Sequence, residues 1–161
     1  MSTREFYIQR IKAEGPAFAK VILAVPTEGG DYRPHPRSRS AAELAWLLAT
    51  EASAAVELVD RHRVEWAEPG AGQGIAAAAG VLEHSQRELL ERVTRLDDAA
   101  WLRKAEFLMG GKIGWSAPLG EMLWGLLFDA IHHRGQLSTY IRPAGGKVPS
   151  IYGPSGDDPG A

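Results

Sequence analysis

Cysteine is absent from this chain of 161 residues. Its absence excludes disulfide bonds, thiolate zinc sites and cysteine nucleophiles. The chain also lacks an excess of charge of one sign, because 18 Lys and Arg residues face 20 Asp and Glu residues, for a net charge of -2. Proteins that bind nucleic acids or anionic membranes through their surface charge are typically basic. The composition therefore predicts no nucleic-acid partner and no membrane partner.

Long hydrophobic runs are missing as well. No stretch approaches the roughly 18 consecutive apolar residues that indicate a transmembrane helix. The first residues, MSTREFY, lack the basic and apolar regions of a signal peptide. We therefore expect a cytoplasmic protein. Its length and its 45% hydrophobic residues suit a single domain over residues 1–161 with its own core.

Helical periodicity predicts four long helices, separated by stretches rich in glycine and proline. Ser40 and Glu43 fit a capping box at the start of the second helix. Gly15 and Pro16 predict a kink or a late start in the first helix. The end of the chain, from about residue 153, is expected to be flexible. The expected helices span residues 3–25, 41–61, 75–96 and 116–142.

The segments between these helices show no convincing strand pattern and no internal repeat. Residues 97–115 are predicted to form one long connection. Four amphipathic helices joined in this way are typical of a bundle. The sequence therefore predicts an all-α fold, a four-helix bundle with a long crossover connection.

Polar side chains interrupt the apolar stripe of the last predicted helix. Asp129 lies at the edge of the apolar arc and His133 lies within it, whereas His132 falls outside and is expected to face solvent or an interface. Asp129 and His133 are four residues apart, so both side chains point to the same side of the helix. Two such ligands can share one cation.

Glu51 lies near the centre of the apolar stripe of the helix predicted over residues 41–61. A buried carboxylate needs a cation, a proton or strong hydrogen-bond donors, because leaving it unpaired costs much free energy. Two carboxylates and one imidazole from two helices predict a divalent-metal site. The alternative is that Glu51 is a protonated or hydrogen-bonded core residue and that His133 is a core histidine.

Three further features have simpler interpretations. Residues 72–77 fit the pattern G-x-G-x-x-A, but no strand is expected before them, which favours a loop leading into a helix over a dinucleotide site. Trp46 is predicted to face away from the bundle and to mark a dimer contact. Gln86 falls on the apolar side of its helix, either as a hydrogen-bonding residue behind the site or as a boundary residue.

Residues 129–157, DAIHHRGQLSTYIRPAGGKVPSIYGPSGD, resemble the DinB-like (DinB/YfiT) superfamily of metal-dependent proteins. The resemblance is carried by HHRGQL and by VP-x-IYGP-x-x-D, and it extends to residues 31–48, DYRPHPRSRSAAELAWLL. It implies a four-helix bundle that is often dimeric. It also implies a metal site with one histidine from the second helix and an H-x-x-x-H pair from the fourth.

This sequence departs from the family pattern at two positions. Asp129 stands at the first position of the histidine pair, and Leu47 stands where the family has the histidine of the second helix. Glu51, one turn after Leu47 on the same stripe, is the natural substitute. Glu51, Asp129 and His133 then predict Zn, Ni, Mn or Fe, with the two carboxylates favouring Mn or Fe. Three protein ligands with water in the open positions are typical of catalytic sites.

These observations lead to two hypotheses about function. The first is a metal-dependent enzyme in which the metal activates water or a low-molecular-weight thiol for transfer or hydrolysis on a small molecule, since the resemblance includes thiol-dependent transferases and isomerases. Gln136, Tyr140 and Arg142 would bind substrate, and the chain would form a homodimer. The alternative is a metal-free, non-catalytic bundle that serves as a small-ligand or stress-response interaction module, and Leu47 favours it.

Overall fold

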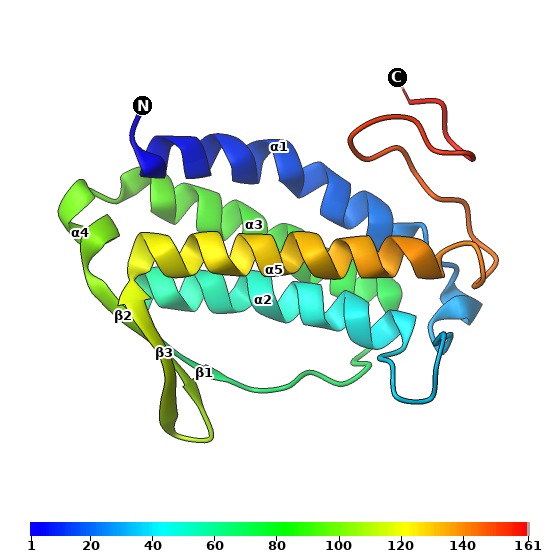
Figure 1. Cartoon of the computed structure of the whole chain (residues 1–161), viewed down its shortest axis with the longest axis horizontal. Coiled ribbons are helices and arrows are strands. Elements are labelled where there is room, and N and C mark those ends of the chain that lie inside the picture. The colour runs from blue at the N-terminus through cyan, green and yellow to red at the C-terminus, as the bar shows by residue number, and fades with distance from the viewer. Residues whose placement is uncertain (161) are drawn as a thin grey trace.

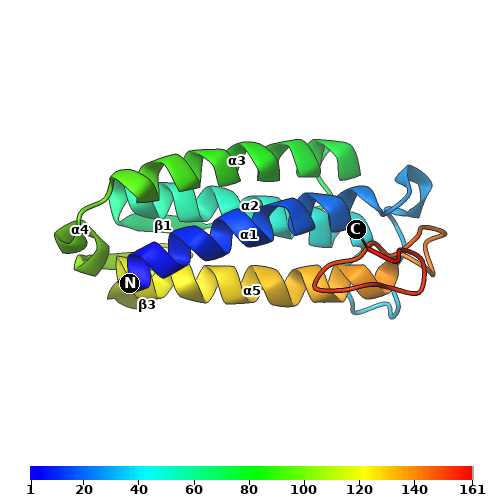
Figure 2. The ribbon, with the colours of Figure 1, turned by 90° about the horizontal axis from the view of Figure 1, so that it is seen from above.

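Four long helices dominate the computed structural model, which describes residues 1–160. α2 packs against α3 and α5, and α1 packs against the same two helices on the other side. Figures 1 and 2 show the four rods side by side along their whole length. All four helices predicted from the sequence are therefore present. They are α1 (Thr3–Leu23), α2 (Ala41–Arg61), α3 (Ile75–Arg95) and α5 (Leu119–Tyr140).

The capping box predicted for α2 is confirmed. The Ser40 hydroxyl accepts a hydrogen bond from the Glu43 backbone N–H, and the Glu43 carboxylate accepts one from the Ser40 backbone N–H. These two bonds satisfy amides that a helix N-terminus leaves without partners. Pro16 lies inside α1, which begins at Thr3, so the helix does not start late.

The structure contradicts the prediction of an all-α fold without strands. A three-stranded sheet lies beside the bundle, with β1 parallel to β2 and β2 antiparallel to β3. Residues 97–115, predicted as one connection, contain a short helix and most of two of these strands. The additional elements are η1 (Thr27–Gly29), β1 (Arg63–Trp66), α4 (Asp98–Leu102), β2 (Lys104–Met109) and β3 (Lys112–Pro118).

A tight hairpin turn at Gly110 and Gly111 joins β2 to β3. Both residues have positive φ values, 58° and 74°, a conformation that glycine adopts at little cost. β3 continues through Pro118, so α5 begins at Leu119 rather than at Ser116 as predicted. The hairpin projects from one end of the bundle in Figure 1.

The core is built from the apolar faces of the four long helices, but it also encloses charged groups. Glu14, Glu51 and Arg134 are each 4% exposed or less. Buried charges are costly unless they are paired or bind a counter-ion. Glu14 and Arg134 pair with each other at 2.7 Å, whereas Glu51 belongs to a different cluster.

The segment after α5 folds back onto the bundle. The Arg142 guanidinium donates a hydrogen bond to Asp157, and the Tyr152 hydroxyl donates one to the buried Glu14. Figure 2 shows this segment crossing the end of α5 and approaching α1. Among the helices of residues 1–160, none has the length and apolar character needed to cross a membrane.

Candidate metal centre

The packing of α2 against α5 brings three predicted ligand residues together. Glu51 comes from α2, and Asp129 and His133 come from consecutive turns of α5. One ligand atom from each residue lies within 4.8 Å of the others. Since metal–ligand bonds are about 2.0–2.3 Å long, one cation placed among these atoms can approach all three side chains with small rotamer changes.

Glu51 is the innermost member of the group. Its Oε1 atom forms a hydrogen bond with Nδ1 of His133 at 2.6 Å, while its Oε2 atom is buried and has no hydrogen-bond partner within residues 1–160. Glu51 and Gln86 both line a cavity of about 50 Å³ whose other lining residues are mainly apolar. An unpaired buried carboxylate oxygen is costly. Glu51 therefore needs a further partner.

Asp129 closes the group on the solvent side, where its side chain is 57% exposed. Its Oδ1 atom lies 3.9 Å from Nε2 of His133. The two ring nitrogens of His133 thus face two different carboxylates, one buried and one exposed. This arrangement holds the imidazole between them and directs Nε2 toward the solvent side.

Burial and the contact between Glu51 and His133 both change proton affinity. Burial raises the pKa of Glu51, and its hydrogen bond with His133 offsets only part of this effect. Burial by itself lowers the pKa of His133, but the hydrogen bond and negative charge of Glu51 outweigh it, so the pKa is raised. The pair therefore holds a proton more tightly than separated side chains would. A metal ion must displace that proton in order to bind.

The small sheet forms one wall of the site. A pocket of about 310 Å³ opens above the three predicted ligands, and Trp66 of β1 and Phe107 of β2 line it. Their rings are stacked with centroids 5.6 Å apart. Leu47 lines the same pocket, so this position on α2 does face the site. The strands that the sequence analysis missed therefore supply the aromatic surface beside the predicted ligands.

A charged pair also borders this pocket and was missed by the sequence analysis. The guanidinium of Arg39 forms a hydrogen-bonded ion pair with Glu68, whose carboxylate accepts a second hydrogen bond from Trp66 Nε1 at 3.1 Å. Both residues lie in connections, where helical periodicity gives no orientation. The only signal in the sequence is the cluster of arginines just before α2.

The predicted substrate-binding residues are divided between two places. Gln136 and Tyr140 line a neighbouring pocket that shares Arg39 with the metal pocket. Arg142 is instead paired with Asp157 in the C-terminal segment. His132 is exposed and contacts Gln136 at 2.9 Å, as expected for a residue outside the apolar arc.

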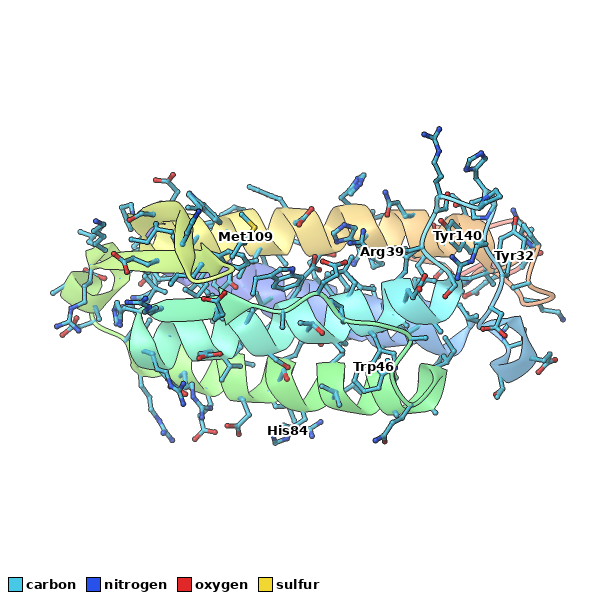
Figure 3. All side chains as sticks on the ribbon, turned by 90° about the horizontal axis from the view of Figure 1, so that it is seen from below. Tyr32, Arg39, Trp46, His84, Met109 and Tyr140 are labelled. Atoms are coloured by element: carbon cyan, nitrogen blue, oxygen red, sulfur yellow. The ribbon has the colours of Figure 1, made fainter. Side chains whose placement is uncertain are left out.

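Trp46 does not present a free surface. A Cβ atom at Gly72 would overlap the indole of Trp46, so the connection before α3 lies directly on this ring (Figure 3). The expectation that no strand precedes residues 72–77 is wrong, because β1 spans Arg63–Trp66. The predicted entry into a helix is present, since Gly74 is the N-cap of α3, which begins at Ile75. The tryptophan therefore no longer supports the predicted homodimer.

The fold and the pocket define a helical bundle with a carboxylate and histidine centre between two of its helices. The chain matches the DinB family over residues 1–159. It belongs to the DinB family. A 46-residue segment, 29% of the chain, is 44% identical to the uncharacterized protein YrdA of Bacillus subtilis and spans 28% of that protein.

Solved structures show the same fold at low sequence identity. The DinB-like protein YjoA of Bacillus subtilis superposes with a TM-score of 0.67 at 14% identity, covering 88% of this chain and 92% of the other. A DinB-like protein of Bacillus cereus gives a TM-score of 0.73 at 18% identity, covering 92% and 97%. A variant of the mycothiol-dependent maleylpyruvate isomerase gives a TM-score of 0.59 at 15% identity, and the superposition covers 89% of this chain and 61% of the isomerase.

Proposed function

We propose that this protein is a divalent-metal-dependent enzyme that acts on a small molecule. The observation that carries the proposal is the convergence of Glu51, Asp129 and His133 at the base of an open pocket. Two carboxylates and one imidazole fit Mn, Fe, Zn or Ni, and the Oε2 atom of Glu51, which has no hydrogen-bond partner within residues 1–160, could bind such a cation. A bound metal would supply a Lewis acid that activates water or a thiol at neutral pH.

The side chains around the pocket would have different roles in binding metal and substrate. Glu51 would fix the orientation of His133 from the buried side, and Asp129 would remain accessible to solvent. Trp66 and Phe107 would cover one side of a substrate and restrict water there. Similarity to a mycothiol-dependent isomerase supports a low-molecular-weight thiol as cosubstrate.

Metal binding is tested on protein purified without an affinity tag. Elemental analysis and calorimetric titration with Mn and Zn would compare the wild type with His133→Ala and with the neighbouring His132→Ala. We expect one metal per chain in the wild type and in His132→Ala, and none in His133→Ala. Equal metal content in all three proteins would contradict the proposed site.

Enzymatic activity requires a separate measurement. Transfer of a small thiol to a chromogenic aryl halide would be followed by absorbance, with metal-loaded and chelator-treated protein compared. We expect turnover only in the metal-loaded form, because metal activation lowers the pKa of the bound nucleophile. Equal turnover in both forms would contradict metal-dependent thiol transfer.

A second candidate function is a metal-free module that binds a small ligand or another protein. It is favoured by the direct hydrogen bond between Glu51 and His133 and by Leu47, an apolar side chain among the predicted ligands. Purified protein without metal that also binds none on titration would favour this module over the enzyme.

We also propose that the chain forms a homodimer. Met109 and Phe128 are 54% and 62% exposed and line one groove beside the hairpin, which supports this face as the contact. Sedimentation of the wild type at micromolar concentrations should give twice the mass of one chain. The Phe128→Asp variant should sediment with the mass of one chain. A monomeric wild type would contradict the dimer.

A further inference from the structure

A cluster of arginines lies in the connection between α1 and α2. Arg33 is paired with Glu43 at 3.5 Å, and Arg39 is paired with Glu68. Arg37 is exposed and forms no ion pair within the described part of the chain. One guanidinium thus remains available beside a second that is held in place by a carboxylate.

Arg37 and Arg39 border a pocket of about 560 Å³ against the last turns of α5. Among residues 1–160, no carboxylate lines it, and its hydrogen-bonding side chains include Ser38 and Thr139. The unpaired guanidinium of Arg37, beside that of Arg39, which is paired with Glu68 outside the lining, favours an anionic ligand. The lining residues of this arginine pocket are Arg37, Ser38, Arg39, Leu44, Gln136, Thr139 and Tyr140.

The arginine pocket lies next to the metal pocket. Arg39 lines both of them, with Gln136 and Tyr140 on one side and the three predicted ligands on the other. Figure 3 shows Arg39 and Tyr140 on the same side of the bundle, toward the end where α5 terminates. A molecule that is bound in the first pocket can therefore extend past Arg39 into the second.

We propose that the arginine pocket binds the oxyanion group, carboxylate or phosphate, of a small substrate whose reactive part lies in the metal pocket. Guanidinium groups recognise both oxyanions through paired, charge-assisted hydrogen bonds. Arg37 supplies the free guanidinium, and Arg39 supplies the one shared with the metal pocket. That the bound oxyanion belongs to the substrate of a reaction rests on the proposed function, whereas the binding of an oxyanion in the arginine pocket does not.

The test uses the full chain freed of metal with a chelator. Succinate and inorganic phosphate are titrated at constant ionic strength, and binding is followed by NMR through the Thr139 amide and the arginine side chains. We expect saturable binding that Arg37→Gln weakens by about tenfold or more, because hydrogen bonds to charged groups contribute strongly to affinity. Arg39→Gln should weaken it as well. The tighter of the two probes identifies the oxyanion that the pocket prefers.

Arg103→Gln is the matched control, because Arg103 is also exposed but lies just before β2, where it borders neither pocket. Unchanged binding in this variant supports a specific site in the arginine pocket. An equal loss of binding in all three variants overturns the proposal, because it indicates non-specific charge attraction. Absence of saturable binding by either probe, with metal binding intact, also overturns the inference. Oxyanion binding that persists in a protein unable to bind metal supports the pocket and contradicts only the proposed enzyme.

Discussion

The Nδ1 atom of His133 lies 2.6 Å from Oε1 of Glu51, and this contact joins α5 to α2 inside the bundle. It leaves Nε2 of His133 facing the exposed carboxylate of Asp129. A carboxylate on one ring nitrogen fixes the tautomer and makes the other nitrogen a better ligand or base. Glu51 can therefore serve the site either as a ligand or as the group that orients His133.

Metal affinity is expected to rise with pH. The pKa values of Glu51 and His133 are both raised, so the metal-free site keeps a proton above the ordinary pKa of histidine, 6.5. Binding must release this proton, and the competition weakens as pH increases through that range. Calorimetry in buffers of different ionisation enthalpy would count the released protons. Affinity that is independent of pH would contradict the shared proton.

The same pKa directions predict the pH dependence of the metal-free fold. A histidine whose pKa is raised on folding stabilises the protein at pH values below the pKa that it has in the unfolded state. This contribution is lost as the pH rises through the pKa that it has in the folded state. The raised pKa of Glu51 acts in the same direction. Urea unfolding at several pH values should therefore show a loss of stability at higher pH that His133→Ala reduces and His132→Ala leaves in place.

The buried ion pair of Glu14 and Arg134 should control stability in acid. Burial by itself raises the pKa of Glu14, but hydrogen bonds from Arg134 and Tyr152 outweigh it and lower the pKa below 4.5. A carboxyl group whose pKa is lowered on folding stabilises the protein at pH values above its pKa in the unfolded state. This contribution is lost as the pH falls through its pKa in the folded state. Urea unfolding of Glu14→Gln should therefore show a smaller loss of stability below about pH 4.5.

Removing Arg134 takes the closest charged partner from the buried Glu14 and leaves it with the partly exposed Arg10 and with Tyr152. Arg134→Met should cost about 3 kcal/mol, the lower end of the range for breaking a buried pair, because Arg10 still compensates part of the carboxylate charge. The double variant Glu14→Gln and Arg134→Met should recover part of that loss. Arg95→Met, which breaks the exposed pair with Glu91, is the control and should change stability only marginally. Equal effects at the two arginines would contradict the importance of burial.

The four helices could be predicted because each carries its signals locally. Ser40 and Glu43 mark one start, and the apolar period places Glu51 and His133 on the buried faces. The sheet could not be predicted in this way, because β1 has four residues and pairs with β2 about 40 positions later. Gly110 and Gly111, flanked by apolar runs, were the available hairpin signal.

The residues of the candidate site also differ in how well the sequence predicts them, depending on whether they lie on helices or in connections and strands. Glu51, Asp129 and His133 lie on helices, so the sequence gives their direction and the structure brings them together. Arg39 and Glu68 lie in connections, whose path depends on tertiary packing rather than on a local period. The wall formed by Trp66 and Phe107 likewise depends on a strand pairing that local sequence does not specify.

Gly72 should be intolerant of any side chain. Its φ of +52° is unfavourable for other residues, and its position against Trp46 leaves no room for a Cβ atom. Gly72→Ala should destabilise the protein by about 1–3 kcal/mol. Gly70→Ala is the control, because no atom of residues 1–160 beyond its chain neighbours would lie within 4 Å of its Cβ. Equal midpoints of the two variants in urea would show that the connection before α3 is not held against Trp46.

Replacing Leu47 with histidine tests the departure from the family pattern. Leu47 lines the pocket of Glu51, Asp129 and His133, so Leu47→His should add an imidazole ligand and tighten Zn or Ni binding relative to Mn. The polar ring should destabilise the metal-free protein by about 1–3 kcal/mol. Zinc should recover part of this loss, because binding to the native state alone adds stability. Leu44→His is the matched control, since Leu44 is equally buried on α2 but lines the arginine pocket. A gain in Zn affinity in both variants, or in neither, would contradict a ligand position at residue 47.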